Sequence, residues 1–156
     1  MDTIRITILG SGTGVPSLTR SSSSILIEIK GEILLFDLGP GTMRRALESG
    51  ITIDRITHLF ISHLHPDHTG ELVSLMFAGK YTGMEKRKNP LTIIAAKGMG
   101  NFYEGLRRVY GKWIEMDEDS LAIREMETMN PDCIGFDSFD VNTMPMDHIE
   151  SSIGFR

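Results

Sequence analysis

Runs of hydrophobic residues divide the chain into short strands and three longer amphipathic segments. Residues 3–10 alternate polar and apolar side chains, whereas 56–62 is mostly apolar and β-branched, as expected of a buried strand. Patterns of these two kinds predict strands at 3–10, 24–30, 32–37, 56–62, 91–96, 121–127, 133–139 and 140–147. Apolar residues at helical spacing predict helices at 41–49, 69–80 and 99–111.

The order of these elements predicts the fold class. Strands cluster first and then alternate with helices, which favours a mixed α/β (α+β) chain with a mixed β-sheet and flanking helices. Glycine and proline mark loops at 39–41 and 130–131, and no repeat or linker divides the chain. A length of 156 residues suits a single domain over 1–156.

Composition indicates the cellular location to expect and whether the chain contains a membrane segment. The chain is 40% hydrophobic and 24% charged, with a net charge of −5, and no apolar run approaches the ~20 residues that a membrane helix needs. Its beginning lacks the basic and apolar regions of a signal peptide. Cys133 is the only cysteine, so no intramolecular disulfide can form, and its apolar surroundings predict a buried, inert thiol. We therefore expect a cytoplasmic protein without membrane association.

Residues 63–68 read His-Leu-His-Pro-Asp-His and place four metal-capable side chains within six positions. His63 and His65 are two apart at a strand end, so their imidazoles should point the same way and give one metal two nitrogen ligands. Pro66 favours a turn, and Asp67 is a good N-cap for the next helix. The turn would present Asp67 and His68 toward a second metal. His58 lies within the strand, and we expect it to be structural.

At these residues the chain resembles the metallo-β-lactamase-fold hydrolases, and among them the branch that includes ribonuclease Z. The resemblance continues at segments 8–16, 35–39, 145–148 and 151–156. It implies the N-terminal half of a four-layer αββα metallo-β-lactamase sandwich. Carried over by position, it implies one metal held by His63, His65 and His148 and a second by Asp67 and His68. Asp37 would brace the metal loop without touching metal.

The resemblance also implies that two further ligands are missing. In such enzymes a bridging aspartate and another histidine lie well downstream of the position of His148, whereas this sequence stops at Arg156. Three imidazoles and a water complete a zinc site, but Asp67 and His68 alone leave the second metal with two protein ligands. We therefore expect a domain truncated at its C-terminal end.

Several positions depart from the ribonuclease Z pattern. The loop at 16–21 lacks the lysine and asparagine that relatives use on transfer RNA, and Pro40 and Ala96 replace other family residues. The glycine-rich loop at 10–15 does not fit a dinucleotide-binding loop, because position 15 is valine; we interpret it as a tight turn near the metal site. Basic residues form two runs that we interpret as solvated surface, namely Lys80, Lys86, Arg87 and Lys88, and Arg107, Arg108 and Lys112.

The function predicted from the sequence is that of a metal-dependent hydrolase, a phosphodiesterase resembling ribonuclease Z. Its substrate would be a phosphodiester or another ester, RNA included, attacked by a metal-activated water that Asp67 orients or deprotonates. Zinc is the favoured ion, in one or two copies, and manganese or iron would also fit. The alternative is a catalytically incomplete metal-binding or interaction module that pairs with another copy as a homodimer.

Overall fold

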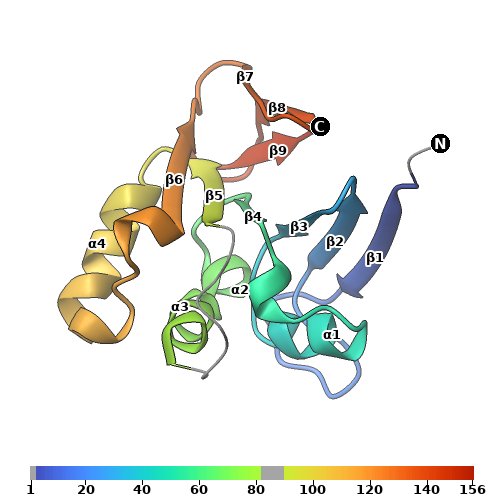
Figure 1. The fold of residues 1–156 in the computed structure, drawn as a ribbon. Helices are drawn as coiled ribbons and strands as arrows, with labels where there is room; N and C mark the ends of the chain where they lie inside the picture. The colour runs from blue at the N-terminus through green and yellow to red at the C-terminus, as the bar shows by residue number, and fades with distance from the viewer. Residues whose placement is uncertain (1–2, 82–89) are drawn as a thin grey trace.

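Two β-sheets form the framework of the computed structural model, which describes residues 3–81 and 90–156. The larger sheet has six strands in sequence order, β1 to β6 (Figure 1). Its strands are β1 (Arg5–Gly10), β2 (Ser24–Ile29), β3 (Glu32–Phe36), β4 (His58–Ile61), β5 (Leu91–Ala96) and β6 (Leu121–Met126). Pairing is antiparallel from β1 to β3 and parallel from β3 to β6.

A smaller antiparallel sheet follows at the end of the chain. It contains β7 (Asp132–Gly135), β8 (Asp140–Pro145) and β9 (Ile153–Phe155) in that order. The first residue of β9 joins this sheet to the larger one, because the backbone N–H of Ile153 donates to the carbonyl oxygen of Ser62 at 3.0 Å. That contact fixes the small sheet beside the end of β4.

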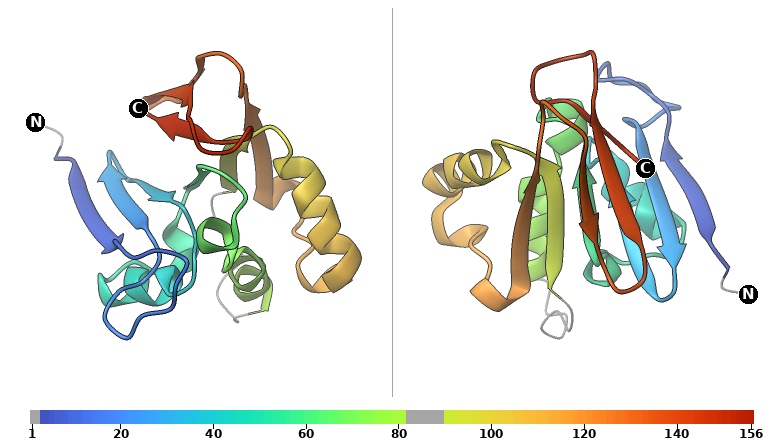
Figure 2. Two further views of the ribbon diagram at one scale, coloured as in Figure 1. Left: turned by 180° about the vertical axis from the view of Figure 1, so that it is seen from behind. Right: turned by 90° about the horizontal axis from the view of Figure 1, so that it is seen from above.

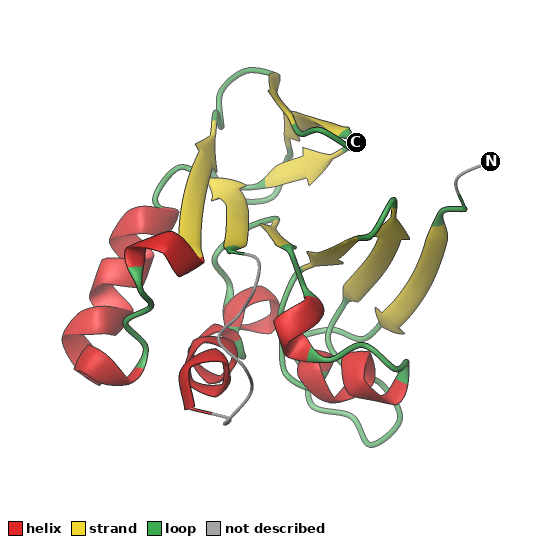
Figure 3. Ribbon diagram, viewed as in Figure 1, coloured by secondary structure: helices red, strands yellow, loops and turns green. Residues whose placement is uncertain are grey.

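Helices cover the face of the six-stranded sheet that is turned away from the small sheet (Figures 2 and 3). They are α1 (Thr42–Glu48), α2 (Pro66–Thr69), α3 (Leu72–Tyr81) and α4 (Met99–Tyr110), with short 3-10 turns at Ile53–Arg55, Gly111–Trp113 and Glu118–Ser120. None of the helices in the described residues is both long and apolar enough to cross a membrane.

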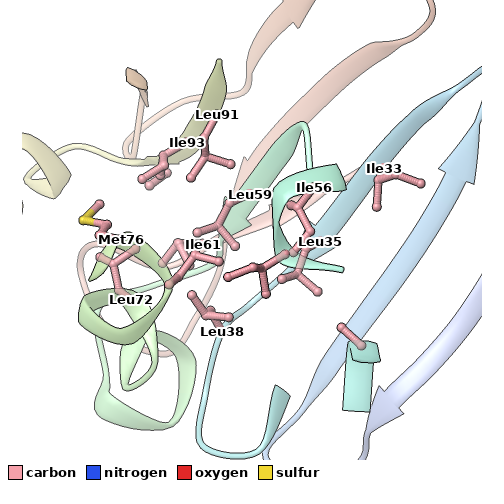
Figure 4. Close-up of a cluster of buried hydrophobic side chains, with 14 of the residues drawn as sticks. Ile33, Leu35, Leu38, Ile56, Leu59, Ile61, Leu72, Met76, Leu91 and Ile93 are labelled. Atoms are coloured by element: carbon pink, nitrogen blue, oxygen red, sulfur yellow. The ribbon is translucent and has the colours of Figure 1, made fainter. Parts of the chain in front are cut away.

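Alternation along the central strands explains why both faces of the sheet are covered. In β4, Leu59 and Ile61 point to the helix side, where they join a core with Leu72 and Met76 of α3 (Figure 4). Phe60 points the other way, into a second core that the small sheet covers. Successive strand residues face opposite sides, so an apolar run without polar interruptions demands a layer on each face.

The structure confirms the predicted mixed α/β class and the eight predicted strands and three predicted helices, with shifted ends. The prediction of one helix over 69–80 was wrong in detail, because α2 already begins at Pro66 and a break at Gly70 separates it from α3. Asp67 is not the N-cap, since His65 takes that position and Pro66 is the first helical residue. Proline suits that place because the first N–H of a helix has no partner within the helix.

The prediction of a buried Cys133 was also wrong, since this cysteine is exposed. Among the described strands β7 pairs with β8 alone, at the edge of the small sheet. Its burial alternates, with Ile134 turned toward the second core and Cys133 turned outward. Strand β9 was not predicted at all. It has only three residues, one of them Gly154, which is too short for an alternating pattern to appear.

Candidate metal centre

Neighbouring parallel strands β3 and β4 end at the same edge of the large sheet, and polar side chains follow both. Phe36 of β3 pairs with Phe60 of β4, so the residue after β3, Asp37, faces the segment after β4, which begins at Ser62. The backbone N–H of Asp37 donates to the carbonyl oxygen of Phe60 at 2.7 Å. The side chains of the site thus lie at the end of two hydrogen-bonded strands.

Three histidines gather at this edge. One ring nitrogen from each of His63, His65 and His148 lies within 4.8 Å of the other two. Nε2 of His63 is 3.1 Å from Nδ1 of His65, and the ring centroid of His148 lies 4.8 Å from that of His63 and 5.3 Å from that of His65. Of the residues that the structure describes, these are the three that form a possible metal-binding group.

The loop between β8 and β9 brings His148 to the other two histidines. The N–H of Met146 donates to Ser152, and the N–H of Ser152 donates to Ile149, so the loop closes on itself. The bond from Ile153 to Ser62 then holds this loop against the residue that precedes His63. The three histidines differ in burial: His63 is buried and His148 is exposed. One side of the group is therefore open to solvent.

Asp67 and His68 approach the same edge from α2. Nε2 of His68 lies 3.6 Å from Oδ2 of Asp67, and the ring centroids of His68 and His63 are 4.0 Å apart. The structure therefore brings all four predicted residues of the 63–68 segment and His148 to one place. Whether they bind metal stays a prediction.

Asp37 connects these histidines to the sheet. Its backbone is left-handed, with φ of 59°, a conformation that aspartate tolerates better than most residues. Oδ2 of Asp37 accepts a hydrogen bond from Nδ1 of His68 at 2.8 Å. Both oxygens are 2.9 Å from the hydroxyl of Ser62, and Oδ1 also accepts from its backbone N–H at 2.8 Å. Ser62 was not among the predicted site residues, although its place directly before the histidine motif is a signal that could have pointed to it.

Two glycines allow the metal loop to pack closely. A Cβ at Gly39 would lie 1.9 Å from the carbonyl oxygen of Asp67, so no side chain fits there. A Cβ at Gly14 would lie 3.3 Å from the carboxyl carbon of Asp67. The glycine-rich loop therefore passes against the predicted metal loop, which confirms its interpretation as a turn near this site.

Burial and charge set the protonation of the histidines. Burial, helped by the neighbouring histidines His68, His65 and His148, lowers the pKa of His63 to about 4, which leaves its ring neutral at pH 7. The hydrogen bond to Asp37 raises the pKa of His68 above its usual value. His58 is apart from this group; its ring packs against Phe136 and Phe139, in keeping with a structural role.

Two of the basic residues predicted to be solvated surface, Arg107 and Lys80, are paired. Arg107 contacts Glu104 and Glu115, and the ammonium of Lys80 donates to the backbone carbonyls of Lys112 and Glu115. Lys86, Arg87 and Lys88 lie outside the described residues.

The donor set fits a divalent cation. Neutral imidazole nitrogens are common metal ligands, and tetrahedral zinc with bonds of about 2.0–2.1 Å places its ligand nitrogens about 3.4 Å apart. The nitrogens of His63 and His65 are already at 3.1 Å. Small shifts of the side chains of His65 and His148 would complete the geometry.

The sheets, the covering helices and the histidine-rich edge define the metallo-β-lactamase fold, and solved structures share it. The short form of human tRNase Z matches 99% of this chain and 64% of its own, with 26% identity and a TM-score of 0.78. The metallo-β-lactamase fold protein YhfI from Bacillus subtilis matches all of this chain and 58% of its own, with 17% identity and a TM-score of 0.77.

A family model described as anti-Pycsar protein Apyc1 matches residues 4–155, and the chain belongs to that family. Curated relatives are ribonucleases Z, among them those of Geobacillus kaustophilus, at 32% identity over 156 residues, and Methanosarcina mazei, at 29% over 152. These alignments cover 98% and 97% of this chain but only 48% and 47% of the relatives. The chain thus spans about half the length of these relatives and matches their N-terminal portion, and the predicted resemblance to ribonuclease Z is confirmed.

Proposed function

We propose that the protein is a metal-dependent phosphodiesterase whose substrates include RNA. In this proposal His63, His65 and His148 hold one divalent cation, with zinc favoured and manganese or iron also suitable. Asp67 and His68 contribute to a second. The observation that carries the proposal is the convergence of three imidazole nitrogens within 4.8 Å, supported by the likeness to ribonuclease Z.

A cation in this group would supply Lewis acidity, by which water ionises near neutral pH and a phosphoryl oxygen is polarised. The residues of the chain have separate tasks. His63 offers a neutral ring because burial keeps its pKa low, and His148 lies on the solvent side, where a substrate enters. Asp67 orients the attacking water or accepts its proton, since its carboxylate lies beside the histidine group, 3.6 Å from Nε2 of His68. His68, held by Asp37, keeps its Nε2 beside Asp67.

Hydrolysis of bis(p-nitrophenyl) phosphate with added Zn²⁺ or Mn²⁺ tests this proposal. We expect turnover by the chain, loss of turnover in a chelator, and a decrease of at least about 100-fold in kcat/KM for His148→Ala, as expected when a metal ligand is removed. Asp147→Ala is the matched control, because Asp147 is an exposed neighbour on the same loop. Absence of turnover with either metal, or equal activity of wild type and His63→Ala, would contradict the proposal. A p-nitrophenyl carboxylate ester and a short single-stranded RNA, assayed in parallel, define the bond type.

The second candidate is a metal-binding module that pairs with another copy, and one observation favours it. Ile4, directly before β1, and Ile6 and Ile8 within it are 57%, 61% and 62% exposed, which is unusual for one side of a strand. Metal analysis combined with solution mass separates the candidates. Two metals per chain with turnover support the enzyme, whereas one metal or none in a stable dimer supports the module.

A further inference from the structure

We propose that Ser62 is a positioning residue that fixes the tautomer of His63, so that the lone pair of Nε2 faces His65 and His148. The inference rests on the proposed function, because it concerns a proposed metal ligand. Its basis is hydrogen-bond counting around one carboxylate, that of Asp37.

The hydroxyl of Ser62 has one proton and two kinds of neighbour. It lies 2.9 Å from both oxygens of Asp37, 3.1 Å from Nδ1 of His63 and 3.3 Å from Nδ1 of His68, whose own proton goes to Asp37. An ionised carboxylate can only accept hydrogen bonds. The hydroxyl proton therefore points to Asp37, and toward His63 the hydroxyl oxygen offers only lone pairs.

The proton between Ser62 and His63 must then come from the imidazole. Nδ1 of His63 carries the hydrogen and donates it to Ser62, because two lone pairs facing each other at 3.1 Å would repel. A neutral imidazole has one N–H, so its Nε2 is left with a free lone pair. That Nε2 is the atom 3.1 Å from Nδ1 of His65. A metal needs an unprotonated ring nitrogen, and the hydrogen-bond chain from Asp37 through Ser62 to His63 provides one at Nε2.

The same carboxylate orients a second histidine directly. Nδ1 of His68 donates to Oδ2 of Asp37 at 2.8 Å, which leaves Nε2 on the side of Asp67. One carboxylate thus presents Nε2 from both histidines, directly for His68 and through the serine for His63. Contacts of this kind with ligand rings set tautomer and orientation in metal sites.

Backbone contacts hold Ser62 in place for this role. Its N–H donates to Oδ1 of Asp37, and its carbonyl oxygen accepts from Ile153. The backbone of Ser62 is therefore fixed on both sides, and its hydroxyl cannot rotate away from Nδ1 of His63 without losing its contacts with Asp37.

Nitrogen-15 NMR of the histidine rings in chelator tests the inference on the 156-residue chain, with His63→Gln identifying the resonances. We expect the wild-type His63 ring to carry its proton on Nδ1. Ser62→Ala should give a mixture of tautomers and weaken zinc binding about 10–100-fold, the usual effect of removing such a partner. Ser62→Thr keeps the hydroxyl and should restore both. Ser49→Ala is the matched control, because the Ser49 hydroxyl donates to backbone carbonyl oxygens of α1, away from the histidines.

A proton on Nε2 of wild-type His63 would overturn the inference, even if Ser62→Ala does not fold. Unchanged tautomer and zinc affinity in a folded Ser62→Ala would also overturn it. The measurement is independent of catalysis: a His63 ring protonated on Nδ1 in a chain that hydrolyses no phosphodiester would support this inference while defeating the proposed function.

Discussion

His58 and His63 are five positions apart, yet their surroundings give them different roles. His58 is buried beside Phe136 and Phe139, with its Nδ1 2.9 Å from the hydroxyl of Thr57. His63 lies past the end of β4, among other histidines. The strand pattern predicted this difference, because a residue inside an apolar strand packs, whereas one at its end is free to bind.

Burial of His58 predicts a pH dependence of stability. Desolvation lowers its pKa below 6.5, and Glu32 opposes this only in part. The unfolded chain therefore binds a proton more readily than the folded chain just below pH 6.5, and folding stability falls as the pH drops from 6.5 toward the lower pKa of the folded state. Burial of His63 acts in the same direction, and the raised pKa of His68 acts in the opposite one.

Urea unfolding in chelator at several pH values between 7.5 and 5 tests this expectation. The loss of unfolding free energy with falling pH should be smaller for His58→Phe than for wild type. Measurement of the same variant at pH 7.5 separates lost packing from lost titration. Parallel pH profiles for the two proteins would show that His58 does not titrate in this way.

The sequence predicted the histidines and Asp37 but not Ser62, for a physical reason. A histidine or aspartate in a dense cluster signals metal chemistry through its type alone. A serine is common everywhere, and its place before the histidine motif is only a weak signal. Its role depends on contacts with the adjacent His63 at 3.1 Å and with Asp37 at 2.9 Å. The second contact joins residues 25 positions apart, which a local pattern does not reveal.

The metal loop and α2 depend on close contact with the turn after β3. The N–H of Leu38 donates to the carbonyl oxygen of His68, and the N–H of Glu71 donates to that of Leu38. Glu71 in turn accepts from the backbone of Gly41 and Met43 at the start of α1. This packing explains why Gly39 has no room for a side chain.

Gly39→Ala should therefore destabilise the chain by about 1–3 kcal/mol, as expected for overpacking, and weaken zinc binding by moving Asp67. Its matched control is Gly79→Ala in α3, where a Cβ meets nothing within 4 Å; there we expect a gain of roughly 0.5–1 kcal/mol from helix propensity. Chemical denaturation with zinc titration measures both effects. Similar results for the two variants would contradict the packing argument.

Elements with long patterns were predictable and short ones were not. The apolar runs of β4 and β5 identify strands buried on both faces, and the helical spacing of α4 is equally clear. The break between α2 and α3 follows Pro66 and Gly70, which could have been recognised, but the apolar spacing after them dominated the pattern. β9 is defined by its pairing with β8 rather than by its own residues.

The small sheet covers only part of the large one. A groove of about 600 Å³ remains between them, lined mainly by apolar residues of β2, β3 and the small sheet together with Ile4 and Ile6. Ile6 lies in this groove and is 61% exposed. Its cross-strand neighbour is Ile27, so the uncovered surface continues across two strands.

Ile6→Lys should reduce self-association with little change in stability, within about 0.5 kcal/mol, because the side chain is mostly in water already. Val109→Lys on α4 is the matched control; Val109 is 76% exposed and lies outside the groove. Sedimentation velocity over a range of concentrations measures the effect. Equal association of the two variants and wild type would show that this groove is not the contact surface.

The histidines of the proposed centre belong to two different sheets, since His63 and His65 follow β4 and His148 lies between β8 and β9. If all three held one cation, that ion would cross-link the two sheets in addition to its part in catalysis. It would close a long loop of the chain and so stabilise the folded state. Extraction of the ion should then loosen the terminal hairpin first, while the six-stranded sheet keeps its order.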